Sequence, residues 1–219
     1  MCMDRKIVVF IMIMAMSVLV SLPTSAANPQ STSLTLTQFR QLVPDLRKGG
    51  YVLYFRHAST DHNYPDEWPV DLTDCESQRV LTPAGRKLAK NIGRVIKKLQ
   101  LPIGQVFSSP FCRCIDTAKL IFDKVDSSDK LYFAMGLTAA EKKARGSQLR
   151  DMLKTPPAAG KNKVLISHTA NLAEAVGLWP RPEGVMFIFL PDGSGKFKHL
   201  GHVHPQLWMK LDPATAAGR

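Results

Sequence analysis

The sequence predicts an α/β protein, a three-layer α/β/α sandwich around a mostly parallel central sheet. Short apolar runs at 51–55, 105–108 and 163–167 have the length and the β-branched and aromatic content of buried strands. Segments with helical periodicity separate these runs, and such alternation is typical of a parallel sheet covered by helices. Two further apolar runs, 185–190 and 197–200, flank a tight turn and predict a closing hairpin.

The first elements of the domain are a helix, a strand and a long loop. Apolar residues at helical spacing predict a helix over 36–46, which a basic turn and two glycines end. The strand over 51–55 leads into a polar loop over 59–80, and loops of this length are usually functional. Thr82 as N-cap and Pro83 at the first helical position then begin a helix with one apolar face.

The later elements continue the alternation. A helix that carries Arg113 follows the second strand. We expect a further strand over 130–135 and a helix over 138–153. The third buried strand is followed by a short helix over 171–176, which a glycine ends.

Residues 1–27 predict a secretory signal peptide. Basic residues precede an apolar run over 7–22, and the small residues Ser25 and Ala27 follow at the spacing of a cleavage site. An uncleaved anchor is the alternative, because the run approaches the lower length of a membrane span. Cleavage would leave 28–219 as one periplasmic or secreted domain without a membrane span.

The chain is basic, with 29 Lys and Arg against 18 Asp and Glu and a formal net charge of +11. Such a charge favours anionic ligands or anionic surfaces. The basic residues are scattered in short groups such as 97–98, 142–143 and 161–163, and aromatic residues are not interleaved with them. The sequence therefore does not predict nucleic-acid binding.

Three predicted strands end next to residues suited to anion chemistry. Arg56 and His57 follow the first strand, Arg113 comes after the second, and His168 follows the third. Since parallel strands end at one edge of a sheet, we expect these side chains to form one cationic pocket. Guanidinium groups bind phosphate through paired N–H donors, and an imidazole among them can attack phosphorus. For the first motif, a surface Arg–His pair that merely ends a strand is the alternative.

These motifs resemble the histidine phosphatase superfamily, also called phosphoglycerate-mutase-like. The tripeptide Arg56-His57-Ala58 is similar to the Arg-His-Gly signature of that family. Segment 108–118 is similar to its S-S-P-x-x-R-x-x-x-T-A motif, and segment 167–171 to its second-histidine motif. The motifs occur in the family's order and span most of the predicted domain.

The resemblance implies a role for each matching residue. His57 would be the nucleophile that becomes phosphohistidine, and Arg56, Arg113 and His168 would hold the phosphoryl oxygens. Asn63 would add a donor. No metal or other cofactor is expected, because these cations supply the charge stabilisation.

Two departures from the family pattern affect the mechanism. Ala58 replaces the signature glycine, and Thr169 stands where one branch of the family has an acid. The other branch takes its general acid from the segment before the second histidine, where Glu141 is the only glutamate. Glu141 is therefore the predicted acid, with Asp61 comparable and an ordinary helix surface as the alternative for Glu141. If neither serves, phosphoramidates or good leaving groups are the expected substrates.

The resemblance also implies a disulfide. Cys75, Cys112 and Cys114 would remain after signal cleavage, in a compartment where one disulfide can persist. The C-x-C pair has no second paired motif at zinc spacing, so we predict no metal site. Because the family's motif order places both loops at one pocket, Cys75 is expected to pair with Cys112 in preference to Cys114.

The sequence thus predicts an exported, metal-independent phosphatase that hydrolyses a small phosphomonoester. An envelope sugar phosphate is one substrate that the family suggests. A catalytically weak phosphate-binding or sensing protein of the same fold is the first alternative, because a clear acid is missing. A phosphomutase is the second alternative, although export would separate it from cytoplasmic phosphorylated acids.

Overall fold

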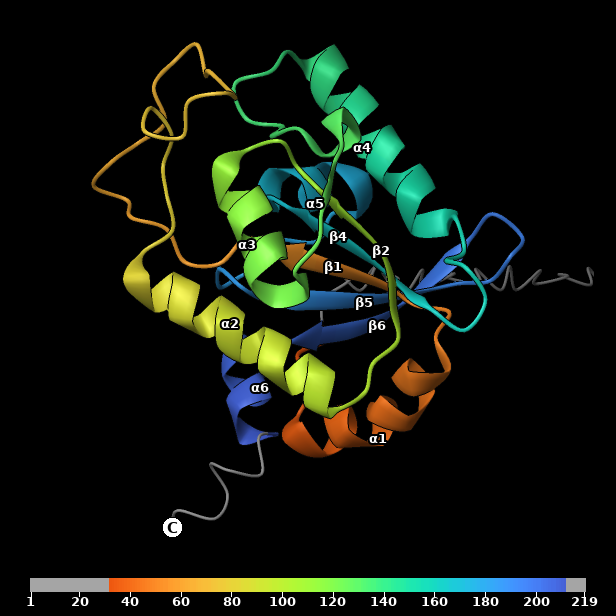
Figure 1. Ribbon diagram of the computed structural model, residues 1–219. Coiled ribbons are helices and arrows are strands. Elements are labelled where there is room, and N and C mark those ends of the chain that lie inside the picture. The colour runs from red at the N-terminus through yellow and green to blue at the C-terminus, as the bar shows by residue number, and fades with distance from the viewer. Residues whose placement is uncertain (1–31, 212–219) are drawn as a thin grey trace, which may run out of the picture.

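The computed structural model describes residues 32–211, in which a six-stranded sheet is covered by helices on both faces (Figure 1). The predicted signal peptide lies outside the described residues. Within 32–211, no helix has the length and apolar character needed to cross a bilayer. The elements follow in the order α1 (Leu36–Lys48), β1 (Val52–Arg56), α2 (Pro83–Lys98), β2 (Ile103–Ser108), α3 (Cys112–Phe122), β3 (Asp126–Ser127), the 3-10 helix η1 (Asp129–Leu131), α4 (Ala139–Lys154), β4 (Asn162–Ser167), α5 (Thr169–Val176), β5 (Met186–Pro191), β6 (Phe197–Val203) and α6 (Pro205–Lys210).

The sheet has the strand order β3-β2-β4-β1-β5-β6. The first four strands in this order are parallel, whereas β5 runs antiparallel to β1 and forms the closing hairpin with β6. β1 is central, since Tyr54 pairs with Leu165 of β4 on one side and Phe187 of β5 on the other. The predicted fold class is confirmed, and β1, β2 and β4 end at the same edge of the sheet.

Side chains of β1 alternate between two apolar cores. Leu53 and Phe55 belong to the core formed with α1, α2, α3 and α6, while Val52 and Tyr54 belong to the core formed with α4 and α5. All four are fully buried. Figure 1 shows the sheet between these two groups of helices. The central strand that carries the first motif is therefore fixed from both faces, which makes its end a rigid support for a site.

The start of α2 clamps the loop that follows β1. The Thr82 hydroxyl accepts a hydrogen bond from the Gly85 backbone N–H at 2.9 Å, as the predicted N-cap requires. The Thr82 backbone N–H donates to the Ser59 carbonyl at 3.0 Å. A Cβ atom on Gly85 would lie 2.2 Å from that carbonyl oxygen, so only glycine permits this close approach.

The predicted strand over 130–135 is wrong. The structure has the two-residue β3 before it, then η1 and an irregular segment. The side chain of Asn171 donates to the carbonyls of Leu131 and Tyr132, at 3.5 and 2.7 Å. These backbone groups are therefore satisfied by a side chain and need no neighbouring strand. The C-terminal α6 was not predicted, because six residues are too few to show helical periodicity.

Candidate active site

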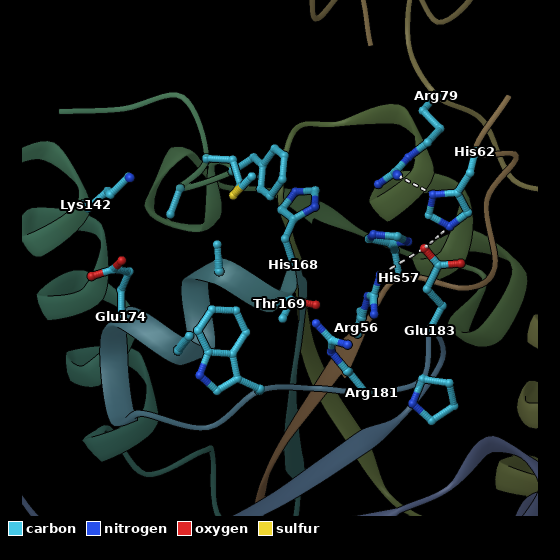
Figure 2. Close-up of a pocket in the computed structure, with 17 residues that line it drawn as sticks. Arg56, His57, His62, Arg79, Lys142, His168, Thr169, Glu174, Arg181 and Glu183 are labelled. Atoms are coloured by element: carbon cyan, nitrogen blue, oxygen red, sulfur yellow. Dashed lines mark hydrogen bonds and ion pairs between the residues drawn. The ribbon is translucent and has the colours of Figure 1, made fainter. Parts of the chain in front are cut away.

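A pocket of about 840 Å³ opens at the carboxyl ends of the parallel strands (Figure 2). Arg56, His57 and His168 all contribute to its wall. The structure thus brings the first and third strand-end motifs together, as the parallel arrangement predicted.

His57 is buried and held in one tautomer. Its Nδ1 lies 2.9 Å from the Ala58 carbonyl oxygen, which can only accept, so Nδ1 carries the proton and Nε2 has a free lone pair. The Ala58 N–H donates to the Thr117 hydroxyl at 3.0 Å, which fixes the turn after β1. Burial lowers the pKa of His57 well below 6.5, and the nearby charge of Arg113 lowers it further. The ring is therefore neutral and nucleophilic near neutral pH.

His168 lies beside His57 with the two ring centroids 5.5 Å apart. The Ser109 hydroxyl is 2.8 Å from His168 Nε2. The ring of Phe133 packs against it at 4.4 Å between centroids. Burial, with a smaller effect from Arg113, lowers the pKa of His168 well below 6.5. Both histidines are thus neutral near neutral pH.

Arg113 is fully buried next to this pair, although its side chain does not line the open pocket. One Nη atom bonds to Asp66 at 2.7 Å, and the guanidinium lies 4.6 Å from the ring centroid of Phe111. The Nε and the other Nη atom have no hydrogen-bond partner. The predicted phosphate-binding arginine is therefore in place with two donors unused.

Unused donors gather on three arginines at this site. Among the described residues, six buried side-chain nitrogen or oxygen atoms have no partner, and four of them belong to Arg56, Arg79 and Arg113. Arg79, at the end of the polar loop, also lines the pocket. Leaving a buried donor without a partner costs on the order of 1–3 kcal/mol. A bound tetrahedral anion would satisfy these donors.

Glu183 is a site residue that the sequence analysis missed. Its carboxylate accepts from Arg56 at 3.0 Å and from the N–H and hydroxyl of Thr60 at 2.9 and 3.0 Å. His62 Nε2 lies 3.4 Å from the same carboxylate. Figure 2 shows Glu183 between His62 and Arg56. Glu183 orients Arg56 and joins the loop after β1 to the segment that precedes β5.

Two predicted site residues lie elsewhere. Glu141 caps α4, where its carboxylate accepts from the N–H and hydroxyl of Thr138 at 2.8 and 2.7 Å, and it is not part of the pocket wall. Asn63 is exposed and uses its backbone N–H to close a turn with Asp61. Neither Asn63 nor Asp61 lines the pocket. The geometry therefore does not support Glu141 or Asp61 as proton donor, nor Asn63 as phosphate ligand.

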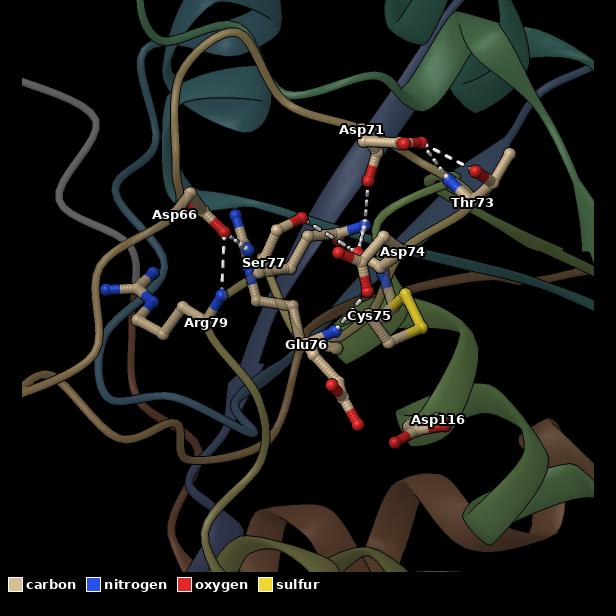
Figure 3. The surroundings of a disulfide bond; sticks show 12 residues. Asp66, Asp71, Thr73, Asp74, Cys75, Glu76, Ser77, Arg79 and Asp116 are labelled. Carbon is tan, nitrogen blue, oxygen red and sulfur yellow. Dashed lines mark hydrogen bonds and ion pairs between the residues drawn. A yellow bond between two sulfur atoms is a disulfide. The ribbon is translucent and has the colours of Figure 1, made fainter.

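A disulfide joins Cys75 in the polar loop to Cys112 at the start of α3 (Figure 3). This is the predicted pairing, and it leaves Cys114 as a buried thiol whose pKa burial raises to about 12. The Gln78 side chain reinforces the bridge by accepting from the Cys112 backbone N–H at 3.0 Å. Arg79 follows Cys75 closely in the same loop and lines the pocket, so the bridge helps to hold this arginine near the histidines.

The same loop supplies a carboxylate that links two arginines. One oxygen of Asp66 accepts from the Arg79 backbone N–H at 2.9 Å and from the Arg113 guanidinium at 2.7 Å. Asp66 therefore positions both the loop backbone at Arg79 and the guanidinium of Arg113 on α3.

Among residues 32–211, no three His, Cys, Asp or Glu side chains are grouped so as to hold a metal ion.

Solved structures share this fold. SixA, a protein histidine phosphatase solved with tungstate, has a TM-score of 0.52 and 18% identity over 71% of this chain and 97% of its own. A phosphoserine phosphatase from Entamoeba histolytica, solved with phosphoserine, has a TM-score of 0.52 and 16% identity over 72% of this chain and 98% of its own. No curated protein sequence gives a significant match.

A family model matches the part of the chain that carries the first two motifs. Residues 52–132 match the histidine phosphatase superfamily (branch 1). This segment contains His57, Arg79 and Arg113, and the fold outside it supplies His168 at the same sheet edge. Residues 52–132 are therefore similar to branch 1 of the histidine phosphatase superfamily, and the described part of the chain shares its fold with the solved structures.

Proposed function

We propose that this protein is an exported phosphatase that hydrolyses a phosphomonoester through a phosphohistidine at His57, without a metal ion. The observation that carries the proposal is the set of four buried, unpartnered N–H donors on Arg56, Arg79 and Arg113 beside a neutral His57. Such donors are matched to phosphoryl oxygens. Their attraction strengthens as negative charge develops during transfer.

The reaction follows from the tautomer of His57. Its Nε2 lone pair attacks phosphorus, the bond from phosphorus to the leaving oxygen breaks, and the phosphoryl group is carried on Nε2. The imidazolium charge that forms is offset by the phosphoryl oxygens, and the Ala58 carbonyl continues to accept from Nδ1. Water then attacks phosphorus, the N–P bond breaks, and His57 returns to its neutral form as inorganic phosphate leaves.

The pocket favours leaving groups that need little help from an acid. Glu183 already accepts from Arg56 and from two donors of Thr60, and Asp66 accepts from Arg113 and the loop backbone. Carboxylates in such surroundings act as acceptors and not as proton donors. Aryl phosphates, whose phenolate leaves without protonation, and phosphoramidates, whose nitrogen can take its proton from solvent before the P–N bond breaks, are therefore the substrates that we expect to react fastest.

Export has separate support. The signal-like segment over 1–27 predicts it, and the Cys75–Cys112 bridge is of a kind that persists in oxidising compartments. An envelope sugar phosphate is then a candidate substrate within reach of the protein. Comparing the chain length and the location of the protein in fractionated cells, with and without the signal-like segment, tests this part of the proposal.

A phosphate-binding protein without turnover is the second candidate. Two carboxylates favour this candidate, because Glu183 already accepts a hydrogen bond from Arg56 and Asp66 accepts one from Arg113. Each arginine then has fewer donors left for a phosphoryl group. A binding protein would use the remaining donors to hold phosphate and would have no need of a leaving-group acid.

Turnover of p-nitrophenyl phosphate by the purified protein separates the two candidates. We expect hydrolysis that is unchanged by a metal chelator and lost in His57→Ala. Binding of inorganic phosphate without hydrolysis would favour the second candidate. Hydrolysis that persists in His57→Ala, or that stops with chelator, would overturn the proposed mechanism.

A further inference from the structure

The pocket has a second, chemically different end. Beyond His168, its wall is formed mainly by apolar side chains from the segment before α4, from α5 and from the loop after α5. These residues are Phe133, Ala134, Met135, Ala170, Ala173 and Trp179. Lys142 and Glu174 add one cation and one anion, and Figure 2 shows both on the side of His168 opposite His62 and Arg79.

The apolar end is exposed, which is unusual in this protein. Among the described residues, only four large apolar side chains are exposed, and Met135 and Trp179 of this wall are two of them, at 54% and 62%. A third, Trp68, lies at the same rim, since its ring would be 3.5 Å from a Cβ atom on Gly136. Exposed apolar surface gathered around a pocket marks a place where a ligand is bound.

The dimensions of the pocket indicate a ligand larger than phosphate. Its volume of about 840 Å³ falls in the range of sites for complete small molecules, roughly 300–1,000 Å³. The arginines and histidines at one end account for the phosphoryl group. The rest of the volume faces Trp179, whose exposed indole offers a flat apolar surface.

We propose that the Trp179 end of the pocket binds a ring with an apolar face, and that the preferred substrates are phosphomonoesters whose leaving group carries such a ring. An aromatic ring or the C–H face of a sugar has this chemistry. Lys142 and Glu174 are placed to meet polar substituents at the edge of the ring. This inference rests on the proposed function for the position of the phosphoryl group, but ring binding itself does not require turnover.

Equilibrium binding in a His57→Ala background tests the inference without hydrolysis. The ligands are 2-naphthyl phosphate, glucose 6-phosphate, the acyclic glycerol 3-phosphate and inorganic phosphate, measured by calorimetry. We expect at least one ring ligand to bind tighter than the acyclic ester. Trp179→Ala should weaken that ligand about tenfold and change the affinity for inorganic phosphate less than twofold, because the unpartnered donors that would hold phosphate belong to Arg56, Arg79 and Arg113.

Two further variants control the measurement. Trp179→Phe keeps an aromatic face and should retain most of the ring affinity. Tyr64→Ala removes an aromatic side chain that is 68% exposed but outside the pocket, and it should have no effect. The naphthyl and glucose arms distinguish an aromatic from a sugar ring.

The inference is overturned if ring ligands bind no tighter than the acyclic ester, or if Trp179→Ala weakens every ligand equally or none. This failure is distinct from failure of the proposed function. Hydrolysis of p-nitrophenyl phosphate that survives His57→Ala would refute the mechanism, whereas a selective loss of ring binding in Trp179→Ala would still support the ring site.

Discussion

Removing the Cys75–Cys112 bridge should lower stability and loosen the active-site loop together. The double variant Cys75→Ser, Cys112→Ser opens a loop closed over a sequence separation of 37. In the chain-entropy model, closing a loop of this length stabilises the native state by about 4 kcal/mol relative to the unfolded chain. Because whole domains are stable by only about 5–15 kcal/mol, this change would be a large share of the total.

Activity should fall together with stability, because the disulfide anchors the polar loop over 59–80, which carries Asp66 and Arg79. Asp66 bonds to Arg113 at 2.7 Å, and Arg79 lines the pocket. The hydrogen bond from the Cys112 backbone to Gln78 remains in the variant and keeps part of the loop in place. We therefore expect reduced but measurable turnover of an aryl phosphate under conditions where the variant is folded.

Urea unfolding with linear extrapolation is the assay. The free energy of unfolding should drop by about 4 kcal/mol and the m-value should rise, because an unfolded chain without the bridge is more extended. A reductant should lower the stability of the wild type to that of the double variant and leave the variant itself unchanged. Cys114→Ala is the matched control, since its stability should still fall on reduction. A loss below about 1 kcal/mol, or no response of the wild type to reductant, would refute this reasoning.

Three other predictions concern the site and its surroundings. Arg113→Ala should reduce kcat/KM at least a hundredfold, on the order of 3 kcal/mol, and Arg113→Lys should recover only part of the loss. The surface control Arg86→Ala should change kcat/KM little, and equal losses in the two Ala variants would argue against a specific role for Arg113. Glu141→Ala should leave turnover unchanged and slightly lower the thermal midpoint by removing a helix cap, so a large loss of activity would restore Glu141 as a catalytic candidate. The rings of His57 and His168 should be neutral at pH 6 in NMR spectra of the free protein, and protonated rings at that pH would contradict this. Because the pKa values of both rings in the folded protein lie below 6.5, protonation favours the unfolded chain, and the free energy of unfolding should fall as the pH drops below about 6.5.

The parallel part of the sheet was predictable because each of its buried strands is a short apolar run that ends at a polar motif. His57 and His168 could be placed together from that rule alone. Glu183 could not, because it comes before an antiparallel strand, β5, whose amino end lies at the same edge as the carboxyl ends of β1 and β4. A rule that considers only strand ends misses a residue at a strand start.

Other differences have local causes. Glu141 follows Thr138 at the spacing of a capping box, so the sequence already contained the signal for its structural role. Arg79 is separated from the other site residues by a long loop, and its position depends on contacts between distant residues, namely the disulfide and the bonds to Asp66 and His62. The irregular segment after η1 depends on the side chain of Asn171, a contact between distant residues that local propensity does not report.

The most direct test of the account is to look for the phosphohistidine itself. The wild-type protein is mixed with an aryl phosphate, quenched in alkali during turnover, digested and examined by mass spectrometry. The account predicts one phosphoryl group on the peptide that contains His57, stable in base, lost in acid and absent from His57→Ala. Steady turnover with no phosphate on that peptide, or with phosphate on a different residue, would contradict the assignment of His57 as the nucleophile.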